Sequence, residues 1–222
     1  MGLQSTRWMQ LEADAWHQRN KAKTTAAISS DDPVIRTLVE AGLKPRTVFE
    51  VGCGHGYRLA AMRDSWGAKV WGCDLSKDAI RYGLQKYGDN DFQIGWREAK
   101  NLRGVPSQAF DMVIYGFCLY ACDPDDLFII AREGDRILKD GGHLVIYDFL
   151  PDHPHSRSYK YDHMLKTYKA DYSKLFLGHP YYSIYKQVVM PHEAGEEING
   201  DTRIAVKILK KDVQNAFPLG DA

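Results

Sequence analysis

The fold is decided by the stretch TVFEVGCGHG, residues 47–56, in which an apolar run leads into three glycines at alternate positions. The apolar run 47–51 predicts a short buried strand, and residues 58–66 predict a helix after the glycines. Glycine accepts a positive φ angle and lets a ligand approach the backbone closely. The stretch therefore predicts a ligand-binding turn between a strand and a helix.

An acidic residue ends the next expected strand, residues 69–74. Asp74 lies about 20 residues after Gly52, and a carboxylate in that position can accept both hydroxyl hydrogens of a ribose. A dinucleotide-binding turn has the spacing GxGxxG, whereas residues 52–56 have the spacing GxGxG. The spacing argues against a nicotinamide or flavin enzyme.

Strands and helices are expected to alternate along the chain. Apolar runs predict strands at residues 92–95, 110–115 and 143–149. A helix at residues 77–87 is expected before the first of these strands, and a helix at residues 126–138 between the last two. Continuous apolar strands between helices are typical of a parallel sheet covered on both faces. After Phe149 the alternation stops, residues 151–180 show no clean strand, and two last strands follow at residues 183–190 and 202–210.

Four features together resemble the class I S-adenosylmethionine (SAM)-dependent methyltransferases over residues 46–149. They are the glycine turn led by Glu50, the acid Asp74, the strand FDMV at 110–113 and the turn LKDGGHL at 138–144. The resemblance implies an α/β, Rossmann-like fold with a seven-stranded, mostly parallel sheet, and SAM as the cofactor. It also implies a cofactor site made of Glu50, Gly52, Cys53, Gly54, Gly56, Asp74, Leu75, Glu98, Ala99, Gly116 and Phe117.

One part of that implied site departs from the family pattern. Where the family often has an aspartate before alanine, this chain has Glu98 before Ala99. Trp96 is the alternative partner for the adenine ring, or else packs beneath the loop.

The segments outside the shared fold are expected to bind the acceptor of the methyl group. We predict an N-terminal helical cap at residues 1–45, a SAM-binding domain at residues 46–222, and an acceptor-site insert at residues 151–182. Trp8 and Trp16 lie near helical spacing, so this helix either closes over the cofactor or docks permanently on the sheet.

Three residues are candidates for catalysis. Asp148 ends the fifth strand, where it is either a general base, an orienting acceptor or a cap for the following loop. His153 lies in the insert, which is rich in tyrosine and histidine, and can accept a proton near neutral pH. Tyr185 can hold a sulfonium through a cation–π contact.

Three functions fit these patterns. The first is methyl transfer to oxygen or nitrogen of a small polar acceptor, including a sugar or a phosphorylated metabolite, because the insert is mildly basic. Residues 16–20 and 168–176 are similar to segments of methyltransferases in surface-polysaccharide pathways. The second is cyclisation of SAM itself, since the Trp8-Met9 start resembles the azetidine-2-carboxylate-forming SAM cyclases. The third is a non-catalytic SAM-binding regulatory subunit.

Composition excludes several other classes. Lys and Arg total 29, as do Asp and Glu, and this zero net charge argues against a general nucleic-acid binder. No apolar run approaches the roughly 18 residues of a membrane span, and four cysteines are too few for a secreted disulfide framework. Cys118 and Cys122 have no further ligands nearby, so no metal is expected. We expect a cytoplasmic monomer or homodimer.

Overall fold

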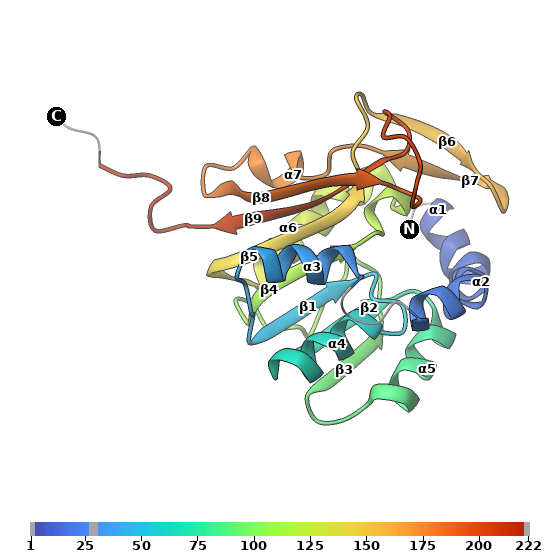
Figure 1. The fold of residues 1–222 in the computed structure, drawn as a ribbon, viewed down its shortest axis with the longest axis horizontal. Coiled ribbons are helices and arrows are strands. Elements are labelled where there is room, and N and C mark those ends of the chain that lie inside the picture. Colours follow the sequence, from blue (N-terminus) through green and yellow to red (C-terminus); the bar gives the residue numbers. More distant parts are fainter. Residues whose placement is uncertain (1–2, 27–30, 220–222) are drawn as a thin grey trace.

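The computed structural model describes residues 3–26 and 31–219, and most of its strands form one sheet (Figure 1). The sheet has seven strands in the order β3-β2-β1-β4-β5-β9-β8. Strands β1 to β5 run parallel to one another, whereas β9 is antiparallel to both β5 and β8. The predicted α/β class and the seven-stranded, mostly parallel sheet are confirmed.

The strand bounds agree with the apolar runs in most places. The seven strands are β1 (Thr47–Val51), β2 (Lys69–Asp74), β3 (Phe92–Trp96), β4 (Phe110–Gly116), β5 (Leu138–Phe149), β8 (Tyr182–Pro191) and β9 (Arg203–Lys211). Strand β5 begins at Leu138 rather than at the expected His143, because Leu138 already pairs with Phe110 across an irregular register.

Helices cover both faces of the sheet. The main ones are α3 (Pro33–Glu40), α4 (Tyr57–Trp66), α5 (Lys77–Tyr87), α6 (Leu127–Ile137) and the short α7 (Lys174–Leu177). Asp32 caps α3 and Ser76 caps α5 by accepting hydrogen bonds from backbone N–H groups in the first turn. These caps explain where both helices begin.

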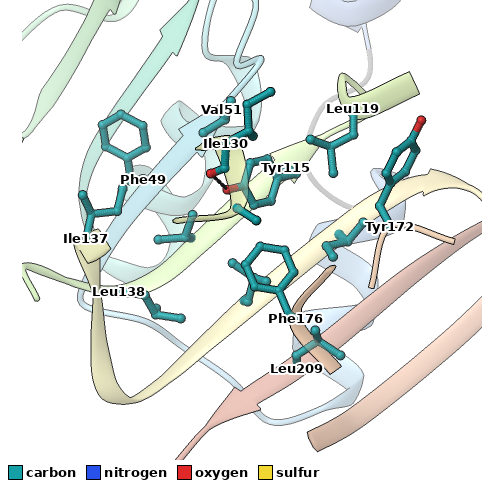
Figure 2. Close-up of a cluster of buried hydrophobic side chains, with 14 of the residues drawn as sticks. Phe49, Val51, Tyr115, Leu119, Ile130, Ile137, Leu138, Tyr172, Phe176 and Leu209 are labelled. Atoms are coloured by element: carbon teal, nitrogen blue, oxygen red, sulfur yellow. Dashed lines mark hydrogen bonds between the residues drawn. The ribbon is translucent and has the colours of Figure 1, made fainter. Parts of the chain in front are cut away.

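The hydrophobic core has two halves, one on each face of the sheet. Val48 and Ile114 pack with α3, α4 and α5, whereas their neighbours Phe49 and Tyr115 pack with α6 and α7. Figure 2 shows the second half, where the Tyr115 hydroxyl donates a hydrogen bond to the Ile130 carbonyl at 2.8 Å. Because α3 belongs to the first half, it packs on the sheet within the region predicted as a cap.

The insert contains a hairpin that the sequence did not predict. Strands β6 (His155–Tyr159) and β7 (Asp162–Lys169) pair antiparallel with each other and form a separate sheet. The expectation of no strand here was wrong. Most side chains of β6 are polar and exposed, so the segment lacks the apolar alternation that marks a strand.

The N-terminal helices dock on this hairpin at the end of the sheet toward which β1 points (Figure 1). They are α1 (Leu3–Arg7), the π-helical turn η1 (Trp8–Glu12) and α2 (Ala13–Ala26). The Gln4 side-chain amide donates to the Lys166 carbonyl at 2.9 Å and accepts from the Lys166 N–H at 3.1 Å. We call residues 3–26 and 155–169 together the cover.

The glycine turn packs directly on Gly83 of α5. A methyl group at this position would overlap the His55 carbonyl oxygen and lie 2.6 Å from the Ile94 side chain. We expect Gly83→Ala to lower the free energy of unfolding by about 2 kcal/mol, because overpacking outweighs the better helix propensity of alanine. Urea denaturation measures the change.

Gly95→Ala is the matched control, since its methyl group meets only the Arg97 side chain, at 3.8 Å. Equal unfolding free energies for the two variants would contradict this close packing.

Candidate active site

The turn after β1 owes its shape to three left-handed glycines, with φ of 71° at Gly52, 55° at Gly54 and 77° at Gly56. A Cβ atom at Gly52 would lie 2.5 Å from Cys118 Cβ, and one at Gly56 would lie 2.6 Å from the Phe92 ring. Within residues 3–26 and 31–219, no atom lies within 4 Å of the corresponding position at Gly54. The outer glycines are therefore needed for packing, and the middle one leaves room for a ligand.

Asp74 faces the turn from the end of β2. One carboxylate oxygen accepts a hydrogen bond from the Gly54 N–H and the other from the Ser76 N–H, both at 2.8 Å. Each oxygen keeps further acceptor capacity, because a carboxylate oxygen has two lone pairs. Burial raises the pKa of Asp74 above its ordinary value, against these backbone bonds.

A buried ion-pair network lies beneath the turn. The Arg58 guanidinium contacts Asp32 with distances of 2.9–3.0 Å and also donates to Glu50 Oε1. Glu50 Oε2 is buried without a hydrogen-bond partner among the described residues. Burial raises the pKa of Glu50 to about 7, although the Arg58 charge lowers it. A Cβ atom at Gly116 would overlap Glu50 Oε1, so β4 needs glycine here.

The expected adenine end of the site lies at Leu75. The Trp96 indole N–H donates to the Leu75 carbonyl at 2.8 Å, and Leu75 packs on the Trp8 cluster of the cover. Glu98 instead forms an ion pair with Lys100 at 3.6 Å, and Ala99 packs on the core.

Asp148 lies inside the protein and holds the loop after β4. It accepts hydrogen bonds from the N–H groups of Leu119 at 3.0 Å, Tyr120 at 3.3 Å and Phe149 at 2.8 Å. Only 2% of Asp148 is exposed, and burial raises its pKa to about 7. These contacts are those of a loop cap.

His153 lies in the insert just after the end of β5, whereas Tyr185 lies in β8. His153 lines a cavity of about 500 Å³ with His155, Arg157 and Asp201. The ring of Tyr185 contacts that of His143, which pairs with Met112 near the start of the parallel strands. The glycine turn lies at the opposite ends of these strands. Tyr185 is therefore not beside the turn, which corrects the predicted contact of its ring with a sulfonium.

Two groups at the site were missed by sequence reasoning. One is the pairing of Arg58 with Glu50 and Asp32, which depends on how α3 and α4 pack. The other is His192, whose ring lies parallel to that of Phe117, with centroids 5.5 Å apart. No local sequence pattern marks Arg58 or His192.

The electrostatics of the turn fit a cationic ligand better than a pyrophosphate. The Glu50 and Asp74 carboxylates flank it, and the Arg58 guanidinium beneath it is already engaged by two carboxylates. An adenosyl group with a sulfonium suits this arrangement, because Asp74 retains acceptor capacity for ribose hydroxyls and the open side of Gly54 admits a ligand.

Comparison with known proteins agrees with a SAM-binding turn. Residues 49–146 match the model of the family described as "Methyltransferase domain". Over these residues the chain is similar to that family. The described residues have the fold of the class I SAM-dependent methyltransferases. It superposes on the Burkholderia thailandensis 1,6-didemethyltoxoflavin-N1-methyltransferase, solved with S-adenosylhomocysteine, with a TM-score of 0.69 and 17% identity over 89% of this chain and 84% of that one.

Several curated relatives are named as methyltransferases, with varied acceptors in their names. The chain is 30% identical to probable thiol methyltransferase 2 of Arabidopsis thaliana over 53% of each chain. It is 32% identical to the demethylmenaquinone methyltransferase of Chlorobaculum parvum, over 54% of this chain and 47% of the relative. The chain thus spans about half the length of these relatives. Within residues 3–26 and 31–219, no helix is long and apolar enough to cross a membrane.

The Arg58 network yields a test of stability. Replacing Arg58 by methionine leaves two buried carboxylates without a countercharge, so we expect a loss of about 3–5 kcal/mol in the free energy of unfolding. The Arg58 charge lowers the pKa of both Asp32 and Glu50, so the variant raises both pKa values, and the cost of keeping these buried acids ionised grows as pH rises. The loss should therefore be larger at pH 8 than at pH 5.

Arg81→Met is the control, because this exposed arginine pairs with Asp78 on the helix surface and should cost less than about 1 kcal/mol. Urea denaturation of both variants at the two pH values decides. A cost for Arg58→Met that is no larger than the control, or that is independent of pH, would refute the role of this network.

Proposed function

We propose that the chain is an enzyme that transfers the methyl group of SAM to an oxygen or nitrogen of a small polar acceptor. The observation that carries the proposal is the open left-handed turn between two carboxylates, Glu50 and Asp74. When bound, SAM supplies an electrophilic methyl group on a sulfonium. The named relatives methylate different kinds of acceptor, so the acceptor class rests on this chain's own residues.

The residues of the turn bind and orient the cofactor in this proposal. Asp74 holds the ribose, the open side of Gly54 receives the ligand, and Leu75 and Trp96 flank the adenine. Asp148 fixes the loop that begins at Phe117 and so positions one wall of the site. Methyl transfer asks little more of a protein than alignment and exclusion of water.

The cover supplies the exclusion of water. Trp8 is 8% exposed and its ring packs on Tyr159 of the hairpin, with centroids 5.1 Å apart. The Tyr159 hydroxyl donates to Glu12 at 2.7 Å, and Arg19 pairs with the same carboxylate. These contacts are internal to the cover, so it acts as one unit, and Asp14 of the cover accepts a hydrogen bond from the Ser76 hydroxyl next to the cofactor site.

Asp74→Asn tests the assignment of the ribose-binding acid. The substitution keeps the shape of the side chain but removes its charge, and a hydrogen bond to a charged group contributes about 1.5–3 kcal/mol. We expect SAM affinity, measured by calorimetry, to fall at least tenfold. Asp91→Asn, an exposed acid before β3, is the control and should bind SAM as the parent does. Unchanged affinity in Asp74→Asn would contradict the assignment.

Product analysis separates the remaining functions. Incubation with SAM and a mixture of small polar acceptors should yield S-adenosylhomocysteine. Methylthioadenosine formed from SAM alone would instead indicate a SAM cyclase. Tight SAM binding without any product, together with a copurifying protein, would indicate a regulatory subunit.

A further inference from the structure

We propose that the acceptor is a flat ring that carries an anionic group, a carboxylate or a phosphate. This inference rests on the proposed function, because it concerns the acceptor side of the same site. The ring would lie against an aromatic cluster at the carboxyl ends of β4 and β5, and the anionic group would meet the ammonium of Lys169. The aromatic cluster consists of Phe117, Tyr120, Tyr147, Phe149 and His192.

The aromatic cluster adjoins the cofactor turn through the end of β4. Phe117 directly follows Gly116, the residue that covers Glu50, and its N–H donates to the Tyr147 carbonyl at 2.8 Å. Phe117 has a φ of 60°, a left-handed conformation that costs about 1–2 kcal/mol for a residue other than glycine. Such strain at the end of a strand is typical of functional sites.

The rings of the cluster surround Phe117. Their centroids lie 5.0 Å from it for Phe149, 5.1 Å for Tyr147 and 5.2 Å for Tyr120. His192 differs from these, because its side chain is exposed and its ring plane lies only 7° from that of Phe117. Two parallel rings, one of them on an exposed loop, provide faces on which a flat ring can stack.

Lys169 supplies the positive charge beside this cluster. Its ammonium lies 4.1 Å from the centroid of the Phe149 ring and donates to the Asp201 carbonyl at 2.6 Å. In the described part of the chain, no carboxylate oxygen lies within ion-pair distance of it. By contrast, Lys207 and Lys211 are buried and pair with Asp171 and Asp135 at 2.7 and 2.8 Å.

The charges around the neighbouring cavity also favour an anion. The cavity of about 500 Å³ is lined by Asp152 and Asp201, among others. Each of these carboxylates already has an arginine partner, Arg203 for Asp152 at 2.6 Å and Arg157 for Asp201 at 2.5 Å. Lys169 feels the charges of Asp201 and Glu196 without an ion-pair contact to either, and burial lowers its pKa, so an anionic partner in direct contact with its ammonium is favourable.

Three small probes test both halves of the inference. Naphthalene-1-carboxylate is flat and anionic, 1-naphthalenemethanol is flat and neutral, and decahydronaphthalene-1-carboxylate is anionic but not flat. NMR titration of the whole chain, with and without S-adenosylhomocysteine, gives their dissociation constants. We expect the first probe to bind at least tenfold more tightly than either of the others.

Variants assign each preference to its residue. Lys169→Gln should remove the preference for the carboxylate over the alcohol, and His192→Ala should remove the preference for the flat over the saturated ring. Lys160→Gln, an exposed lysine in the turn of the same hairpin, should change neither.

The outcomes separate two failures. Equal affinity of the parent for all three probes, or preferences that survive in Lys169→Gln and His192→Ala, would overturn the inference. Absence of S-adenosylhomocysteine binding would overturn the proposed function, and the probe titrations without it would still decide the ligand class.

Discussion

A single buried guanidinium holds together the part of the molecule on which everything else depends. Arg58 lies in α4. Its side chain contacts Asp32, which caps α3, and Glu50 of β1. Both carboxylates are almost wholly buried, and the Arg58 charge lowers the pKa of each. The network ties two helices to the central strand just before the glycine turn, and so fixes where that turn stands.

The turn connects this ion-pair network to the side of the site that is proposed to bind the cofactor. Asp74 joins β2 to the turn through the Gly54 N–H, and Asp14 of the cover accepts from the Ser76 hydroxyl at 2.7 Å. Turn, α5 and cover are therefore linked by carboxylates. The cover itself combines two segments far apart in sequence, which explains why neither the N-terminal helices nor the hairpin β6–β7 stands alone.

Local patterns were enough to predict the strands of the sheet and the glycine turn, because each depends on residues close in sequence. The hairpin was missed because β6 is polar on most positions and is stabilised by its pairing with β7. Tyr185 was misplaced because composition says nothing of register, and the strand β8 carries this residue to the far edge of the sheet. Lys169 and His192 meet the aromatic cluster only through tertiary packing.

The central claim is that the turn 52–56 receives an adenosyl sulfonium. The most direct measurement is an NMR titration of protein labelled with ¹⁵N-glycine, following the amide signals of Gly52, Gly54 and Gly56. We predict that S-adenosylhomocysteine shifts these signals to saturation and that a nicotinamide dinucleotide leaves them unchanged. Shifts caused by the dinucleotide instead, or shifts with S-adenosylhomocysteine confined to glycines elsewhere, would contradict the account.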